Sequence, residues 1–206
     1  MRKMTDSLSV MILTGGTSKR FGSDKSEALI DGRALIDHLI GQIPTGLPTV
    51  IVGPDRDSYG AEIQVVQESP ALGGPVSAIA AGVALVKTEL VAIFATDMPF
   101  GPLLIPNLLA ALDLACDAVV PIDDGGFVQP LGAIYRVNSL LKALESFETV
   151  TGESMRNLLS YLKVVKIPID DSIAHFLIDI DTQADLRKAV SLNKEMNPRL
   201  ISREGR

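Results

Sequence analysis

Short runs of mainly apolar residues alternate with segments of helical spacing along the first 121 residues of the chain. The runs that predict strands cover 9–14, 49–53, 62–67, 90–96 and 117–121. The segments that predict helices cover 34–43, 75–86 and 103–112. Strands that are apolar on both faces have to be covered on both faces, which is typical of parallel sheets between two layers of helices. We therefore expect an α/β fold, with one Rossmann-like domain whose mostly parallel sheet carries helices on both faces.

The second half of the chain is less regular and predicts a mixed part added to the parallel sheet. Strands are expected at 131–135, 164–168 and 176–180. Helices are expected at 137–147, 154–162 and 182–190. Because no linker divides the sequence, we expect one domain over 1–190, followed by a flexible polar tail over 191–206.

The composition excludes several classes of protein. Apolar residues make up 47% of the 206 residues and the formal net charge is −6, which is ordinary for a globular domain. An acidic chain offers no broad cationic surface to a nucleic acid, although a few local cations suffice for a small anionic ligand. No apolar run approaches a membrane span, and the first one is too short for a signal peptide. We therefore expect a cytoplasmic protein without nucleic-acid or membrane partners, in which the single Cys116 packs in the core.

The strongest candidate for a binding site is the glycine-rich, basic segment 13–25, which directly follows the first expected strand. Glycine lets the backbone approach a ligand and turn its N–H groups towards an anion. Three cations against one acid give the segment a local charge of +2, carried by Lys19, Arg20, Asp24 and Lys25. The spacing fits neither a Walker loop nor a dinucleotide fingerprint. It favours a nest for a triphosphate, and the alternative is a tight surface loop with solvated charges.

Acidic residues stand at two places that suit a divalent cation. Asp97 follows the apolar strand at 90–96, at the end where open α/β sheets bind ligands. Its carboxylate is a hard oxygen ligand of the kind that Mg²⁺ takes, and the alternative is that it caps the next helix. Asp179 and Asp181 are two residues apart and would share one face of a strand. The alternative for Asp181 is that it caps the helix at 182–190.

The segment 13–25 (LTGGTSKRFGSDK) resembles the signature L-x-G-G-x-S-x-R-[MFL]-G-x-D-K of the molybdenum cofactor guanylyltransferases, a MobA-like nucleotidyltransferase family. Weaker matches at 74–75, 96–99 and 179–186 spread the resemblance over most of the chain. The family has a nucleotide-diphospho-sugar transferase fold, in agreement with the architecture expected above. One departure lies at 179–183, where many members have Asn-x-Asn-Thr-Pro and this chain has Asp-x-Asp-Thr-Gln.

The resemblance implies a role for each matching residue. The nucleotide-binding residues would be Leu13, Thr14, Gly15, Gly16, Lys25, Glu68, Gly74 and Asp97. The first three would contact the base and ribose through their backbone, and Glu68 stands roughly where the family reads the guanine edge. Arg20 and Lys25 would hold the phosphates and act in catalysis. Asp97 would bind Mg²⁺, with Asp181 as a second metal ligand, as an Asp is in related pyrophosphorylases.

The activity that the resemblance implies is the transfer of GMP from GTP to the phosphate of the molybdopterin cofactor, with Mg²⁺ as cofactor and pyrophosphate as the second product. Residues 129–131 resemble a short family motif on the side where the pterin would lie. Gly53 replaces an asparagine of the family, so that one base or ribose contact is missing or is supplied differently. The resemblance also allows for a transient contact with molybdoenzymes or with other cofactor-biosynthesis proteins.

Two other functions stay open. A cytidylyltransferase, or a nucleotidyltransferase acting on a sugar or lactate phosphate, would share the segment 13–25 and Asp97. The start Leu-Thr-Gly-Gly favours guanine, since cytidine enzymes of this group usually have Ala-Ala-Gly there, whereas Asp-x-Asp near the end of the chain points more weakly the other way. The second alternative is a non-catalytic nucleotide-binding partner protein, against which the presence of Arg20, Lys25 and Asp97 argues.

Overall fold

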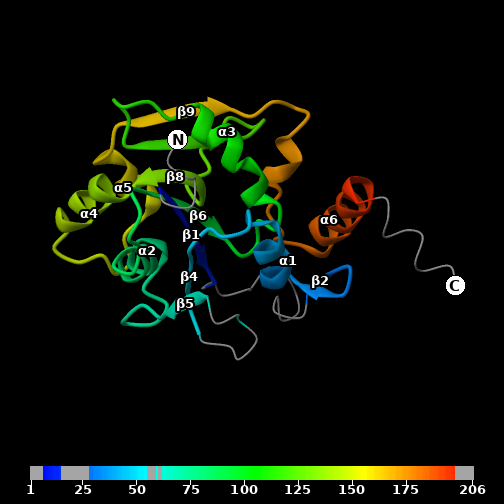
Figure 1. Ribbon diagram of the computed structural model, residues 1–206, viewed down its shortest axis with the longest axis horizontal. Coiled ribbons are helices and arrows are strands. Elements are labelled where there is room, and N and C mark those ends of the chain that lie inside the picture. The colour runs from blue at the N-terminus through cyan, green and yellow to red at the C-terminus, as the bar shows by residue number, and fades with distance from the viewer. Residues whose placement is uncertain (1–6, 15–27, 55–58, 60–61, 198–206) are drawn as a thin grey trace, which may run out of the picture.

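A seven-stranded, mostly parallel sheet runs through the middle of the protein (Figure 1). The computed structural model describes residues 7–14, 28–54, 59 and 62–197. The strands are β1 (Leu8–Leu13), β4 (Thr49–Val52), β5 (Ile63–Val66), β6 (Leu90–Ala95), β7 (Ala118–Ile122), β8 (Gly132–Arg136) and β9 (Val164–Pro168). Their order is β5-β4-β1-β6-β8-β7-β9, and β8 alone runs antiparallel to its neighbours. The expected α/β fold is thereby confirmed.

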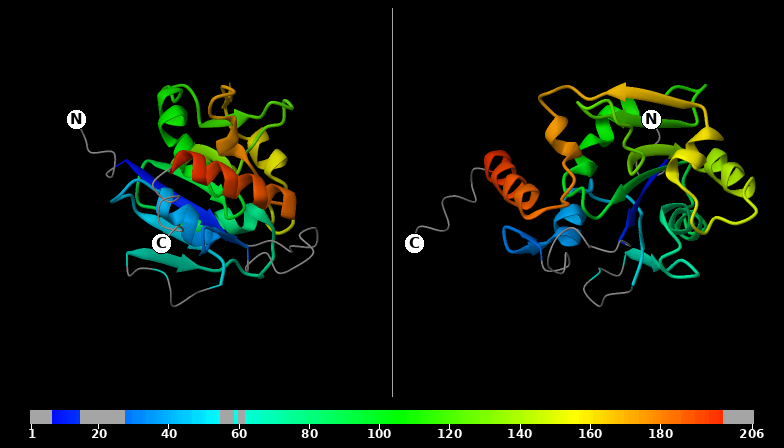
Figure 2. Two further views of the ribbon diagram at one scale, coloured as in Figure 1. Left: turned by 90° about the vertical axis from the view of Figure 1, so that its right-hand side faces the viewer. Right: turned by 180° about the vertical axis from the view of Figure 1, so that it is seen from behind.

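Helices cover both faces of the sheet. The α-helices are α1 (Leu35–Gln42), α2 (Pro75–Val83), α3 (Ile105–Ala110), α4 (Val137–Glu145), α5 (Met155–Ser160) and α6 (Gln183–Met196), and the 3-10 helices are η3 (Gly101–Leu104) and η4 (Ala174–Leu177). Helices α2, α4 and α5 lie on one face, whereas α1 and α3 lie on the other with α6 beyond α1 (Figures 1 and 2). Strand β1 shows why the strands are apolar throughout. Met11 packs in the core under α2 and α4, whereas Val10 and Ile12 pack in the core under α1 and α3.

A small hairpin that the sequence analysis did not predict precedes α1. It joins β2 (Leu29–Ile30) to β3 (Arg33–Ala34) through the two-residue turn Asp31-Gly32. Both turn residues have positive φ, 48° at Asp31 and 76° at Gly32, which is the conformation that favours Asp-Gly in tight hairpins. The Asp-Gly dipeptide is therefore the feature of the sequence from which this hairpin could have been predicted.

The strand expected at 176–180 is wrong. The 3-10 helix η4 occupies the first part of this region, and the Ile180 N–H donates to the carbonyl of Asp97, 2.9 Å away, rather than to a neighbouring strand. The alternation instead comes from Phe176, Ile178 and Ile180, which all pack against the small core beneath α6, while Leu177 packs into the core under α1 and α3.

The flexible tail expected from residue 191 is also corrected, because α6 continues to Met196. The additional turns are held by contacts with the hairpin. Asn193 is buried, and its side-chain amide donates to the carboxylate of Asp31, while Leu192 and Met196 pack against the small core beneath α6. Residues 198–206 lie outside the described part of the chain.

Two further expectations concern single features of the chain. Cys116 is buried in the core under α3, as expected. Of the helices that the structure describes, none combines the length and the apolar character needed to cross a membrane.

Candidate active site

The candidate site lies where β1 and β6 end side by side. The two strands pair in parallel, with Leu13 opposite Ala95 in the last register position. The strands that follow β1 and β6 lie on opposite sides of this pair in the sheet. After β1 come β4 and β5 on one side, and after β6 come β7, β8 and β9 on the other. Open α/β sheets bind their ligands at such a point, beyond the carboxyl ends of the strands.

Hydrogen bonds fix the end of β1 between its two neighbours. The Leu13 carbonyl accepts from the Thr96 N–H at 3.1 Å and from the Thr96 hydroxyl at 3.0 Å. On the other side, the Thr14 N–H and the Thr14 hydroxyl donate to the Val52 carbonyl, at 2.9 and 3.0 Å. Leu13 is therefore anchored in the sheet, and the backbone of the signature segment leaves the sheet at Thr14.

Gly53 is required by the position of Thr14. A Cβ at residue 53 would lie 1.8 Å from the Thr14 hydroxyl oxygen, and the φ of Gly53 is 147°, a conformation that side chains disfavour. The glycine that departs from the family pattern thus makes room for the threonine that follows β1. The two residues belong to one local arrangement, and this coupling was not apparent from the sequence.

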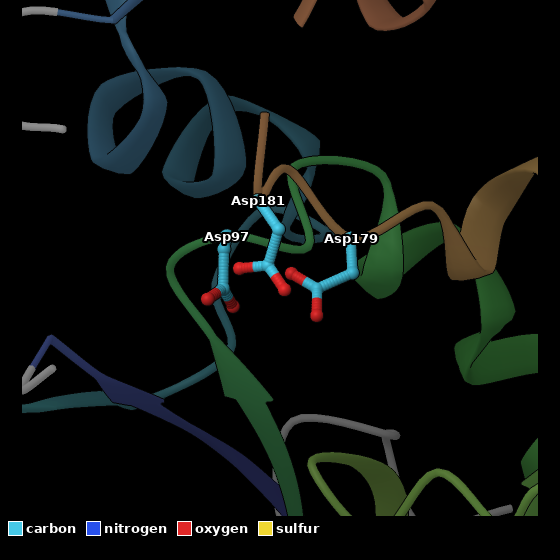
Figure 3. Close-up of side chains that lie close together, drawn as sticks. All are labelled: Asp97, Asp179 and Asp181. Atoms are coloured by element: carbon cyan, nitrogen blue, oxygen red, sulfur yellow. The ribbon is translucent and has the colours of Figure 1, made fainter. Parts of the chain in front are cut away.

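Three aspartate side chains converge beyond the end of β6 (Figure 3). Asp97 comes from the turn after β6, whereas Asp179 and Asp181 come from the segment between η4 and α6. One carboxylate oxygen of each residue lies within 4.8 Å of those of the other two. Ile180 aligns the two segments, because its N–H donates to the Asp97 carbonyl and its side chain is fully buried. With Ile180 fixed inwards, the aspartates on either side of it are directed outwards to Asp97.

The helix-capping alternatives do not hold for these aspartates. Thr182, not Asp181, caps α6, in a reciprocal arrangement with Asp185 in which each side chain accepts from the other residue's backbone N–H. The hydrogen bond from Thr182 holds the pKa of the Asp185 carboxyl below its usual value. The 3-10 helix after Asp97 has Phe100 as its N-cap. Neither Asp97 nor Asp181 is thus the N-cap residue of the helix that follows it.

The donor set fits a Mg²⁺ ion. Adjacent oxygen ligands of octahedral Mg²⁺ are about 3.0 Å apart and opposite ones about 4.2 Å apart, because each bond measures about 2.1 Å. One carboxylate oxygen of each of the three aspartates lies within 4.8 Å of those of the other two, which is close enough for one cation to lie among them. Asp97 and Asp181 were predicted as the metal ligands, and the structure places them together. It adds Asp179, whose signal in the sequence was the Asp-x-Asp spacing.

Glu68 has a structural role in the turn before α2. Its side chain is only 7% exposed, and its carboxylate accepts from the Leu72 N–H at 2.9 Å. This hydrogen bond closes the turn 68–72, in which Leu72 has a φ of 62°. One carboxylate oxygen is thus committed to the turn, and the contact of Glu68 with a guanine edge stays a prediction.

The turn leads into the start of α2 at the same edge of the sheet. Gly74 is the N-cap of α2 and has a φ of 91°, and Pro75 follows as the first helical residue. The preceding Gly73 accepts a hydrogen bond from the Gly152 N–H at 2.8 Å, which links this turn to the loop before α5. A Cβ at Gly73 would lie 2.6 Å from the Ser77 hydroxyl oxygen, so that close packing requires glycine there. The predicted nucleotide contact at Gly74 is not tested by these contacts.

Residues 15–25 of the signature segment lie outside the described residues, and they include Gly15, Gly16, Arg20 and Lys25. Their roles stay predictions. The described residues on either side of this gap are Thr14, next to β6, and Ala28, which is buried and directly precedes the hairpin.

A mostly parallel α/β sheet with three carboxylates gathered beyond two adjoining central strands places this protein among the open α/β proteins, which bind ligands at this edge of the sheet. Within that class, the sequence profile of the MobA-like NTP transferase domain matches residues 10–165. The chain therefore belongs to this family and is a nucleotidyltransferase.

Relatives extend the match beyond the profile. A probable molybdenum cofactor guanylyltransferase of Natranaerobius thermophilus is 28% identical over 90% of this chain and 96% of its own. One from Bacillus cereus strain ATCC 10987 is 30% identical over 87% of this chain and 94% of its own. The resemblance inferred from the segment 13–25 is thereby confirmed.

Solved structures agree with this assignment. Molybdopterin-guanine dinucleotide biosynthesis protein A from Archaeoglobus fulgidus superposes with a TM-score of 0.69 at 26% identity, covering 91% of this chain and 99% of that one. The 2-C-methyl-D-erythritol 4-phosphate cytidylyltransferase of Thermus thermophilus gives a TM-score of 0.64 at 16% identity, covering 91% and 99%. This second likeness shows the shared fold alone.

Proposed function

We propose that this protein transfers GMP from GTP to the phosphate of the molybdopterin cofactor, forming the guanine dinucleotide of the cofactor and pyrophosphate. The observation that carries the proposal is the convergence of Asp97, Asp179 and Asp181 beside the end of β1, where the signature segment 13–25 begins. The guanylyltransferase names of relatives that match over nearly their whole length support the choice of substrates.

The reaction joins two phosphates. An oxygen of the acceptor's phosphate forms a bond to the α-phosphorus of GTP. The bond from that phosphorus to the oxygen bridging to the β-phosphate breaks, and pyrophosphate leaves with the bonding electrons. The attacking oxygen is already anionic near neutral pH, so that no strong base has to remove a proton. Catalysis then depends on placing the reacting atoms in line and on balancing the phosphate charge.

Two groups of charged side chains would serve this reaction, one cationic and one anionic. Arg20 and Lys25 of the signature segment would bind the phosphates directly. Asp97, with Asp179 and Asp181, would hold Mg²⁺, which when bound acts as a Lewis acid on phosphate oxygens. Three carboxylates without a cation would repel both anionic substrates, and so the cluster supports a metal-dependent reaction. The contact with molybdoenzymes or other biosynthesis proteins stays a prediction.

A nucleotide panel tests the proposal. The purified protein is incubated with molybdopterin, Mg²⁺ and GTP, CTP, ATP or UTP in turn, and pyrophosphate release is measured. We expect release with GTP and little with the other three nucleotides. A clear preference for CTP would make the protein a cytidylyltransferase instead. The protein would be a non-catalytic binding protein if it binds nucleotide but releases no pyrophosphate with any acceptor, whether molybdopterin, a sugar phosphate or a lactate phosphate.

Asp97→Asn tests the carboxylate cluster directly. Loss of this ligand should lower kcat/KM by about 100- to 1000-fold, the size of effect that follows when a charge-stabilising group is removed from a transition state. Asp171→Asn is the matched control, since Asp171 is an exposed carboxylate before η4, and its activity should stay near that of the wild type. Both variants should unfold at nearly the wild-type temperature. Near-normal turnover of the folded Asp97→Asn protein would refute the role of the cluster.

A further inference from the structure

The loop between β7 and β8, residues 123–131, lies at the same edge of the sheet as the three aspartates. Strand β7 points in the same direction as β6, because β8 runs antiparallel to both of them. The last residue of the loop lies beside the end of β6, since the Leu131 carbonyl accepts from the Ala95 N–H at 3.2 Å. Strand β7 itself is two strand spacings, about 10 Å, from β6. The loop therefore flanks the candidate active site on the side away from β1 and β4.

Asp123 holds this loop in one conformation. One of its carboxylate oxygens accepts from the Phe127 N–H at 2.8 Å, and the other accepts from the Gln129 side-chain amide at 2.8 Å. Its backbone N–H and carbonyl are bonded as well, to the Phe127 carbonyl and to the Gly126 N–H, at 3.0 Å each. At the other end of the loop, the hydroxyl of the fully buried Tyr135 donates to the Pro130 carbonyl at 2.6 Å.

Phe127 stands out from this fixed loop into solvent. Its side chain is 70% exposed. The edge of its ring rests over Gly125, where a Cβ would lie 3.0 Å from the ring carbon Cδ2. The glycine thus makes room for this edge of the ring, while the rest of the ring remains uncovered. A held aromatic ring with an open side can stack with a planar ligand at a small entropic cost.

We propose that Phe127 is a binding residue for the acceptor substrate and stacks against the planar pyrimidinone ring of its pterin, while the acceptor's phosphate reaches towards Asp97. This inference rests on the proposed function, because it assigns the aspartates to the reacting phosphates. The ends of β6 and β7 are about 10 Å apart, so the loop that carries Phe127 is near enough to the aspartates for one acceptor molecule to contact both. Phe127 selects acceptors with an aromatic ring over open-chain phosphates.

Steady-state kinetics with molybdopterin as the varied substrate, at saturating GTP and Mg²⁺, test the proposal. Phe127→Ala should raise the KM for the acceptor about 5- to 100-fold, the range measured for loss of one stacking side chain. The KM for GTP and the kcat at saturating acceptor should change by less than about twofold. Phe127→Tyr and Phe127→Trp should keep the acceptor KM near the wild-type value, whereas Phe127→Leu should give a KM between those of wild type and Phe127→Ala.

Leu114→Ala is the matched control, because Leu114 is 97% exposed in the loop before β7, at the opposite edge of the sheet. A second readout needs no turnover: quenching of the fluorescence of a pterin monophosphate on titration with protein should weaken in Phe127→Ala and not in Leu114→Ala. An unchanged acceptor KM in Phe127→Ala, or an equal rise in the KM for GTP, would overturn the inference. If wild-type protein releases no pyrophosphate but binds the pterin in a Phe127-dependent way, the proposed reaction fails and this inference stands.

Discussion

Gly53→Ala should disrupt the junction between β1 and β4, because the new methyl group and the Thr14 hydroxyl cannot occupy the same space. The added Cβ would lie 1.8 Å from that oxygen. The Thr14 side chain would have to rotate and would lose its 3.0 Å hydrogen bond to the Val52 carbonyl, which costs about 1 kcal/mol. The φ of 147° adds about 1–3 kcal/mol of backbone strain for any side chain. We therefore expect the free energy of unfolding to fall by about 2–4 kcal/mol.

Denaturant unfolding of Gly53→Ala, Thr14→Ala and the double variant separates the two contributions. With Thr14 shortened to alanine, the backbone strain and a 3.1 Å contact with the Cβ of residue 14 remain, so that Gly53→Ala should cost about 1 kcal/mol less in that background. Gly152→Ala is the control for strain alone, since Gly152 has a φ of 80° and nothing within 4 Å of its added Cβ. Additive effects of the two substitutions, or equal losses at residues 53 and 152, would contradict the steric reasoning.

Two further predictions concern hydrogen bonds that stabilise the fold. Asp117→Asn should lower the free energy of unfolding by about 1 kcal/mol near pH 7, because Asp117 accepts from the Ser139 hydroxyl and the Lys163 N–H. The Ser139 bond, more than any other cause, lowers the pKa of Asp117 in the folded protein. The wild-type advantage should therefore persist above the usual pKa of 3.8 and disappear as the pH falls through the lower folded value, which urea unfolding at several pH values checks. Thr182→Ala should remove the cap of α6 and lower the melting temperature by about 2–4 °C through a loss of about 1 kcal/mol, with no change if Asp185 alone fixes the helix start.

The central sheet was predictable because one physical constraint dominates it. Residues of β1 alternate between two cores, and a strand covered on both faces has to be apolar throughout. The Asp-Gly hairpin at 31–32 was missed although its turn signal is strong, since two-residue strands are too short to show a pattern. The strand expected at 176–180 failed for a different reason. Alternating apolar residues also arise when a segment packs one side against a small core outside the sheet, as Phe176, Ile178 and Ile180 do. Only the hydrogen-bond partner of the backbone distinguishes the two cases.

The candidate site was predictable in part. The position of Asp97 after a buried strand gave its place at the sheet edge, and Asp181 was assigned through the family resemblance. The three-way convergence with Asp179 depends on a hydrogen bond between Ile180 and Asp97, two segments more than 80 residues apart in the chain. Contacts of this separation are set by the tertiary fold, which the spacing of residues along the sequence does not reveal.

Titration calorimetry with GTP, in the presence and absence of Mg²⁺, tests the central claim that the end of β1 and the aspartates beyond β6 form a metal-dependent nucleotide site. The account predicts that wild-type protein binds GTP with Mg²⁺, that EDTA weakens the binding strongly, and that Asp97→Asn abolishes the dependence on Mg²⁺. A folded protein that gives no heat of binding with GTP, CTP, ATP or UTP in millimolar Mg²⁺ would contradict it.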